Sequence, residues 1–123
     1  MANAWRELVP ELPVADLERA LNHYQGTLGF TLQWVYEAHG FASVIRDGVR
    51  LFLRRQNPPF DEVVCNFYVD DVDAVYAELV ASGAHVLCAP ADKPWGTREF
   101  SFDDPDQNLF RVHRLLKKAD EAA

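Results

Sequence analysis

The residues from 94 to 108 combine side chains suited to ligand recognition with the signals of a tight turn. Trp95 offers a large amphipathic ring, and Gly96 beside it can adopt a positive φ that lets a ligand approach the backbone. Alternating polar and apolar residues from 98 to 103 predict a half-buried strand, and the run Asp-Pro-Asp-Gln-Asn after it predicts a turn. We interpret the segment either as the lip of a binding site or as an ordinary hairpin with one exposed tryptophan.

Other reactive side chains stand without a recognisable catalytic context. The serines lack the surroundings of a nucleophile elbow or a triad, and the sequence has no phosphate-binding glycine loop. Adjacent carboxylates such as Asp70 and Asp71 lie where a helix is expected to begin, so N-capping explains them better than acid-base chemistry. The four histidines have no metal-ligand spacing and are interpreted as surface or supporting residues (His23, His39, His85 and His113).

The elements that would position these residues form two similar series. In the first, strands are expected at 5–14, 30–37, 41–46 and 49–55, with a helix that begins after Asp16 and ends by Gly29. Residues 56–61 are the one linker-like segment. In the second, strands are expected at 63–69, 84–89, 98–103 and 109–114, with a helix that begins after Asp71 and ends by Gly83.

An offset of 55 residues relates the two predicted N-caps, Asp16 and Asp71, and their neighbours. The spacing indicates a tandem repeat of βαβββ units, at about 5–55 and 62–114, followed by a polar tail at 115–123. We therefore predict one α+β domain over residues 1–123. Each unit would form a four-stranded sheet with a helix on one face, so the other face needs cover from the partner unit, another chain or a ligand.

Composition narrows the function classes. A chain of 123 residues that is 49% hydrophobic and 25% charged is long enough for one core. Its net charge of −7 argues against nucleic-acid binding and permits a cationic ligand. No apolar run is long enough to span a membrane and the first residues do not resemble a signal peptide, so a cytoplasmic protein is expected. Cys65 and Cys88 are interpreted as reduced core residues.

Several motifs together resemble the vicinal oxygen chelate superfamily, which includes glyoxalase I, extradiol dioxygenases and bleomycin-resistance proteins. They are Leu-Gly-Phe at 28–30, Phe-Ala at 41–42, Pro-Trp-Gly at 94–96, Arg-Glu-Phe at 98–100 and Asp-Pro-Asp at 104–106. The resemblance covers roughly residues 8 to 114 and is greatest to the bleomycin-resistance proteins. It implies paired βαβββ units in a cup-shaped mixed sheet, and a homodimer that exchanges its N-terminal strand.

The resemblance also marks four positions that hold a divalent metal in the enzymes of this superfamily. Here those positions map to Val9, Leu53, Val64 and Arg111. None of these side chains can ligate a hard or borderline cation, so no metal, no other cofactor and no catalytic residue is expected. A shift of the mapping by two residues would instead place Glu11 or Asn66 in the cup.

Strand alternation from these positions predicts what lines the cup. The inward residues would be Glu11, Leu51, Leu53, Arg55, Val64, Asn66, Tyr68, Leu109, Arg111 and His113. Leu12, Val14, Phe52, Cys65, Phe67, Val69, Phe110 and Val112 would pack against the helices. The mixed character of the inward set is typical of an organic ligand pocket.

By resemblance, the function is sequestration of a planar, often cationic drug without a chemical step. Trp34, Phe41 and Trp95 would stack on the ligand, with Gly96 at the lip of the pocket and Tyr68 in its lining. Glu11 and Asn66 would make polar contacts, while Arg111 would either pair with Glu11 or meet a ligand carboxylate. Alternatives are an aromatic seal at a dimer interface, a metal-dependent lyase or dioxygenase, and a structural or partner-binding module.

Overall fold

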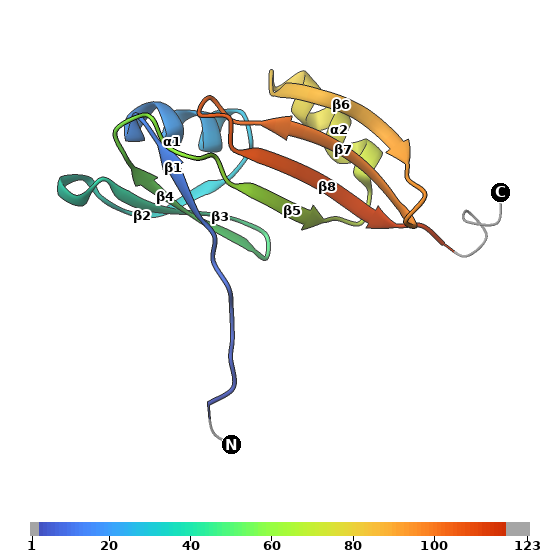
Figure 1. Ribbon diagram of the computed structural model, residues 1–123, viewed down its shortest axis with the longest axis horizontal. Helices are drawn as coiled ribbons and strands as arrows, with labels where there is room; N and C mark the ends of the chain where they lie inside the picture. Colours follow the sequence, from blue (N-terminus) through green and yellow to red (C-terminus); the bar gives the residue numbers. More distant parts are fainter. Residues whose placement is uncertain (1–2, 118–123) are drawn as a thin grey trace.

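A computed structural model describes residues 3–117, which form two βαβββ units in succession (Figure 1). The elements in chain order are β1 (Glu11–Val14), α1 (Leu17–Gly26), β2 (Thr31–Tyr36), β3 (Phe41–Arg46), β4 (Val49–Arg55), β5 (Val64–Tyr68), α2 (Val72–Ala81), β6 (His85–Asp92), β7 (Thr97–Asp103) and β8 (Leu109–Leu115). A short 3₁₀ turn at Glu37–His39, which the sequence pattern did not predict, joins β2 to β3. The predicted α+β class and repeat are confirmed.

The strands form two four-stranded mixed sheets, one in each unit, as the repeat predicted. Sheet A has the order β1-β4-β3-β2 and sheet B the order β5-β8-β7-β6. In each sheet the first strand of the unit pairs in parallel with the last, and the other neighbours are antiparallel. Helix α1 packs on sheet A and α2 on sheet B.

The two helices begin as predicted and end earlier than predicted. The carboxylates of Asp16 and Asp71 accept hydrogen bonds from Arg19 N and Ala74 N, each at 3.0 Å, and so satisfy backbone donors of the first turn. The helices end at Gly26 and Ala81 rather than at the positive-φ glycines that follow. In the described range neither helix approaches the length and apolarity that a membrane span requires.

The first predicted strand is much shorter than expected. Only Glu11–Val14 forms a strand, and residues 3–10 form an arm that runs away from the body (Figure 1). The arm contacts β4 through Pro10 O, which accepts from Phe52 N at 3.0 Å, and through Glu7 Oε2, which lies 3.4 Å from Arg50 Nε. Trp5 is 99% exposed and Leu8 is 88% exposed on this arm. The prediction of a strand from residue 5 was wrong because the pairing of β1 with β4 begins only at Glu11.

The hydrophobic core lies between the sheets and their helices, and it corrects the predicted facing of β4. Leu51 and Leu53 are buried in the core, whereas Phe52 lies on the face that α1 does not cover. The β4 prediction was therefore out of register by one residue, which moves every side chain to the opposite face. Arg55, also predicted to face inward, is exposed at the strand end.

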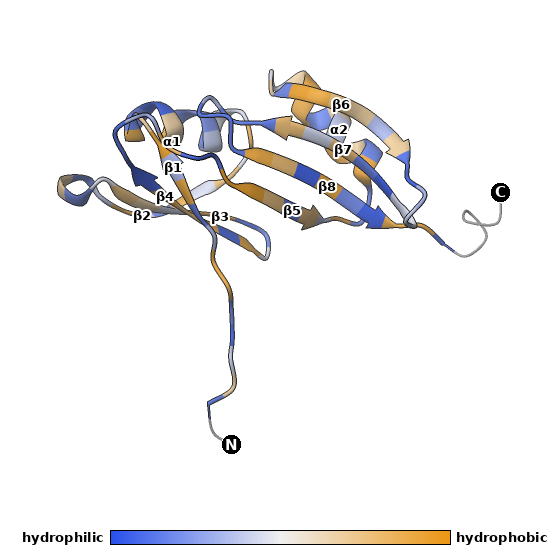
Figure 2. Cartoon of the chain, viewed as in Figure 1, coloured by the Kyte–Doolittle hydropathy of each residue, from blue (hydrophilic) through white to orange (hydrophobic). Residues whose placement is uncertain are grey.

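The facing predicted for β5 and β8 is correct. Cys65, Phe110 and Val112 are buried in the core, while Asn66 and Arg111 are exposed on the other face. Figure 2 shows the resulting alternation of hydrophobic and hydrophilic residues along β8.

Burial raises the pKa of the Cys65 thiol to about 11, in keeping with a core residue. Cys88 was wrongly assigned to the core, because it is exposed on the edge strand β6.

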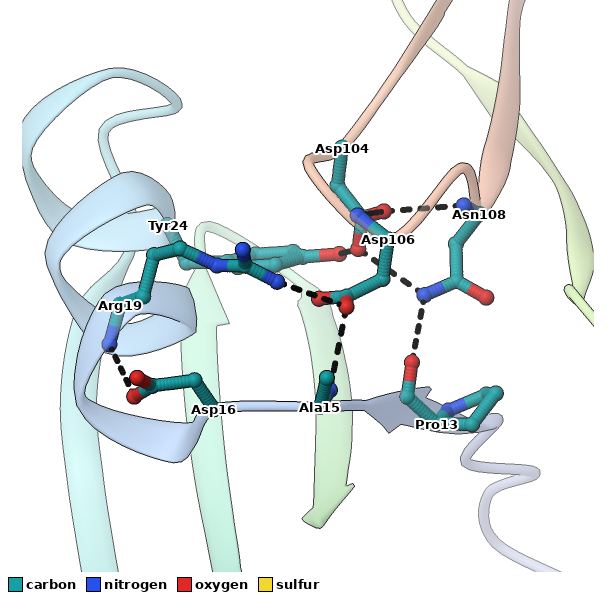
Figure 3. Close-up of polar contacts among 8 residues, drawn as sticks. All are labelled: Pro13, Ala15, Asp16, Arg19, Tyr24, Asp104, Asp106 and Asn108. Atoms are coloured by element: carbon teal, nitrogen blue, oxygen red, sulfur yellow. Dashed lines mark hydrogen bonds and ion pairs between the residues drawn. The ribbon is translucent and has the colours of Figure 1, made fainter. Parts of the chain in front are cut away.

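The turn between β7 and β8 joins the two units through a buried hydrogen-bond network (Figure 3). Asn108 is fully buried, and its amide donates to Pro13 O and to Asp104 Oδ2, both at 2.9 Å. Its Oδ1 accepts from Val63 N at 2.9 Å. The hydroxyl of Tyr24 on α1 donates to Asp104 Oδ2 at 2.7 Å. The predicted turn is confirmed, and it also links β1, α1 and β5.

A second set of contacts extends this network to the start of α1. Asp106 Oδ1 accepts from Ala15 N at 3.0 Å and from the guanidinium of Arg19 at 2.9 Å. The Asp106 side chain is almost completely buried. The turn therefore holds the first helix as well as the first strand of the preceding unit.

Replacing Asn108 by leucine should destabilise the fold strongly. The change removes three side-chain hydrogen bonds and leaves Val63 N and Pro13 O buried without partners, so the free energy of unfolding should fall by about 3 kcal/mol. Urea denaturation of N108L against the exposed α1 control Asn22→Ala measures this. Equal stability of the two variants would contradict the role given to the turn.

Burial and the neighbouring Asp104 raise the pKa of Tyr24 well above its usual value of 10.0. The native state therefore disfavours the phenolate. The contribution of protonated Tyr24 to the free energy of unfolding is fully present below pH 10 and is lost as the pH rises further. At pH 11 the wild type should have lost roughly 1.4 kcal/mol more than Tyr24→Phe, relative to pH 8. Urea denaturation of both proteins at the two pH values measures this difference. An equal change in the free energy of unfolding of the wild type and Tyr24→Phe would refute the prediction.

Candidate ligand-binding site

Four aromatic rings gather on the face of sheet A that α1 leaves uncovered. The ring centroid of Trp34 lies 5.0 Å from that of Phe41, 5.5 Å from that of Phe52 and 5.4 Å from that of Tyr36. Phe41 and Phe52 are 5.2 Å apart. We call Trp34, Tyr36, Phe41 and Phe52 the aromatic cluster.

Strand pairing explains why these rings meet. Trp34 lies opposite Ser43, which lies opposite Phe52, so the three residues share one face. A register irregularity between Leu32 and Trp34 sets this pairing. Leu32 pairs with core residue Val44, so without the irregularity Trp34 would take the same face as Leu32.

Two charged residues border the aromatic cluster. The guanidinium of Arg54 lies 3.7 Å from the ring centroid of Phe41, a cation–π contact. Its Nε lies 3.6 Å from Glu11 Oε2. Glu11 therefore has Arg54 as its partner, and its pairing with Arg111, one of the two roles left open for that arginine, is not seen among the described residues. The cluster thus offers an apolar surface of mutually tilted rings with one carboxylate and one guanidinium at its edge.

A second group lies on the uncovered face of sheet B. His113 Nε2 is 2.8 Å from Asn66 Oδ1, and His113 Nδ1 is 2.5 Å from Glu99 Oε2. The ring of Tyr68 stacks on the imidazole with centroids 5.2 Å apart. Glu99 and His113 are only 9% and 7% exposed, so these contacts hold a buried ionisable pair. We call Asn66, Tyr68, Glu99 and His113 the polar group.

Glu99 was not among the predicted site residues. A signal for it existed, because Phe100 and Phe102 face the core and alternation therefore places Glu99 on the opposite face. Its pairing with His113 joins β7 to β8 across a register that the sequence pattern does not reveal. Thr97 adds a hydrogen bond from its hydroxyl to Glu99 Oε2 at 3.1 Å.

The predicted site residues thus fall into separate places. Trp34, Phe41 and Glu11 come together on sheet A. Asn66 and Tyr68 lie together on sheet B, where Arg111 is exposed opposite Asn66 in the strand register. Trp95 and Gly96 lie between β6 and β7, where the indole is 66% exposed and Gly96 has a φ of 89°. Gly96 O accepts from Leu116 N at 2.9 Å, which fixes the base of this loop.

The residues present do not fit the metal site of the superfamily enzymes. Leu53, one of the four mapped positions, faces the core, and its neighbours on the uncovered face are Phe52 and Arg54. Phenyl and guanidinium groups do not supply lone pairs to a cation. Across residues 3–117 no three His, Cys, Asp or Glu side chains are arranged to hold a metal ion.

Comparison with known proteins agrees with this architecture. Residues 8–112 match the sequence family described as the glyoxalase/bleomycin resistance protein/dioxygenase superfamily. The chain belongs to this superfamily. A bleomycin resistance protein of Geobacillus stearothermophilus is 28% identical over 129 aligned residues, which cover 89% of this chain and 96% of that protein.

Solved structures of the superfamily have the same fold. The bleomycin resistance determinant encoded on transposon Tn5 superposes with a TM-score of 0.80 at 20% identity, covering 90% of this chain and 98% of that one. A bleomycin-binding protein from Streptomyces verticillus, solved with copper(II)-bleomycin, gives a TM-score of 0.76 at 23% identity and covers 95% and 100% of the two chains.

Neighbouring residues on β4 should respond differently to truncation. Leu53→Ala removes a fully buried side chain and should lower the free energy of unfolding by about 3 kcal/mol. Phe52→Ala, on the uncovered face, should cost only about 1 kcal/mol. Urea denaturation of both variants compares their free energies of unfolding directly. A larger loss for Phe52→Ala than for Leu53→Ala would contradict the assignment of Leu53 to the core face of β4.

Proposed function

We propose that this protein binds an organic molecule of the bleomycin type and sequesters it without a chemical step. The observation that carries the proposal is the aromatic cluster on a sheet face that no element of the described chain covers. Aromatic rings gathered on an open surface provide stacking sites for a planar ligand. Each stacking contact contributes about 1 kcal/mol beyond the area that it buries.

The charges beside the aromatic cluster suit a ligand with a cationic group. Glu11 is half exposed and its contact with Arg54 is 3.6 Å long, so the carboxylate remains accessible to an approaching amine. Arg54 is already stacked on Phe41, which supports that ring as a platform. The net charge of −7 adds a favourable long-range field for cations.

Sheet B supplies the polar contacts of the proposed site. Asn66 offers an amide whose orientation His113 restrains, and Tyr68 offers an exposed ring that the same imidazole supports. Arg111 is assigned to an anionic group of the ligand. Trp95 and Gly96 form the proposed lip, where the exposed indole can close over a bound molecule.

The proposed working form is a homodimer in which the arm of each chain crosses to its partner. Trp5 and Leu8 lie almost fully exposed on a segment that makes little contact with its own body. Burying both side chains against a second chain would remove a large apolar area from water. A partner chain would also give the uncovered sheet faces a second wall.

The relatives support drug binding over catalysis. The Geobacillus stearothermophilus protein bears the name bleomycin resistance protein and aligns over most of both chains. The superfamily also includes dioxygenases, so a metal-dependent lyase or dioxygenase is the rival function. The residues at the mapped metal positions, Val9, Leu53, Val64 and Arg111, lack the donor atoms which that rival requires.

Drug binding is testable by tryptophan fluorescence. Metal-free bleomycin should quench the wild-type emission saturably, because Trp34 lies in the aromatic cluster. Phe41→Ala retains all three tryptophans and should weaken the affinity about tenfold, the equivalent of 1.4 kcal/mol. Val80→Ala, an exposed change on α2, is the matched control and should bind like the wild type.

Two results would count against this function. One is the absence of saturable quenching in the wild type, and the other is equal affinity of Phe41→Ala and Val80→Ala. Stoichiometric zinc, nickel, manganese or iron in protein purified without chelators would instead favour the metalloenzyme.

The dimer is testable separately. Replacing Trp5 and Leu8 together by serine removes the two large apolar side chains of the arm while leaving the core intact. Native mass spectrometry and sedimentation should show a dimer for the wild type and a shift to monomer for W5S/L8S. A wild-type monomer, or an unchanged dimer in the variant, would contradict an exchange of the arm.

A further inference from the structure

The repeat creates two equivalent junctions between the units, and only one of them is filled. Helix α2 follows α1 at an offset of 55 residues, and the caps Asp16 and Asp71 make the same hydrogen bond. At the first junction the turn of residues 104–108 lies against the start of α1. Tyr24, Arg19 and the turn carboxylates occupy the space there (Figure 3).

At the second junction the counterparts of Tyr24 and Arg19 are smaller, and the turn is shorter. The offset places Leu79 where the first unit has Tyr24, and Ala74 where it has Arg19. The turn between β3 and β4 consists only of Asp47 and Gly48, whereas five residues separate β7 from β8. A cavity of about 650 Å³ lies between this short turn and α2. Its size falls within the range of small-molecule sites.

The floor of the cavity is apolar and comes from both units. Phe30 contributes from the first unit, and Phe67, Val69, Val75 and Phe102 contribute from the second. These residues belong to the core or pack against it. The cavity therefore lies mainly on the helix side of the sheets, away from the aromatic cluster, and Tyr68 is the one member of the polar group that lines it.

The rim of the cavity carries carboxylates that can pair with a positively charged group. Asp47 and Asp70 line it and are exposed, and neither makes an ion pair within residues 3–117. The cation at the rim, Arg46, makes its ion pair with Glu78 and also interacts electrostatically with Asp47. Its guanidinium donates to Glu78 Oε1 at 2.7 Å and to Leu28 O at 2.8 Å. The start of α2 does not offer an anion site, because the Asp71 carboxylate caps it.

We propose that this junction cavity is a second binding site, which takes a small amphipathic cation with an aromatic body and an amine. The ring would displace water from the apolar floor, and the ammonium would lie between Asp47 and Asp70. This site shares no residue with the aromatic cluster, and of the residues assigned to the proposed function only Tyr68 also lines it.

The test is an NMR titration of the full chain with 2-naphthylmethylamine, with the neutral 2-naphthalenemethanol as the matched probe. The amine should shift the amide signals of Gly48, Ala74 and Val75 saturably, and the alcohol should bind several-fold more weakly. Replacing Asp47 and Asp70 by asparagine should weaken the amine about fivefold, the effect of losing about 1 kcal/mol of ion pairing, and leave the alcohol unchanged.

Two tryptophan variants on α2, one inside the cavity lining and one outside it, locate the site. Ala74→Trp places a bulky ring at the cavity wall and should abolish the shifts of Gly48 and Val75. Ala77→Trp, on the same helix, is exposed and does not line the cavity, so it should bind like the wild type. Melting temperatures within a few degrees of the wild type confirm that both variants fold.

Three outcomes would overturn the proposal. They are the absence of saturable shifts at these amides, equal binding of the amine and the alcohol, and equal effects of the two tryptophan variants. Failure of bleomycin binding at the aromatic cluster would leave this site untouched, because the probe, the reporters and the variants all differ.

Discussion

The structure depends on one buried amide, that of Asn108. Its side chain holds the carbonyl of Pro13 in β1, the amide of Val63 ahead of β5 and the carboxylate of Asp104 in its own turn. Three segments far apart in the sequence therefore meet at one fully buried residue. Because an unsatisfied group here would cost the full desolvation penalty, the network strongly favours one arrangement of the two units.

That arrangement divides the surface into two kinds of face. The sides of the sheets that meet α1 and α2 are filled with aliphatic and phenyl groups, which form one continuous core. The opposite sides carry the aromatic cluster and the polar group, whose members are half-buried or exposed apart from the Glu99 and His113 pair. Rings and hydrogen-bonding groups held on rigid strands are preorganised, so a ligand that binds there does not have to order them.

Local signals in the sequence predicted much of the fold. The bounds of β3 and β4 are as expected, because the Asp47-Gly48 turn is a strong hairpin signal. The caps Asp16 and Asp71 were also correct, since a short acidic side chain before an apolar stripe has one main structural use. The superfamily followed from several motifs read together.

Features that depend on distant partners were not predictable in the same way. Leu51, Phe52 and Leu53 are all apolar, so the alternation of β4 does not reveal which residues face the core. The irregularity that turns Trp34 toward Phe52 has no glycine to mark it. The pairing of Glu99 with His113 and the isolation of the arm depend on which strands become neighbours.

The central claim is that the ligand lies on the uncovered faces of the sheets rather than among the helices. A ¹H–¹⁵N NMR titration of the metal-free protein with metal-free bleomycin tests it most directly. We predict saturable shifts of the Trp34 indole N–H and of amides in β2, β3 and β4, with smaller changes at Asn66 and Tyr68. Shifts confined to α1 and α2, or no saturable shift at all, would contradict it.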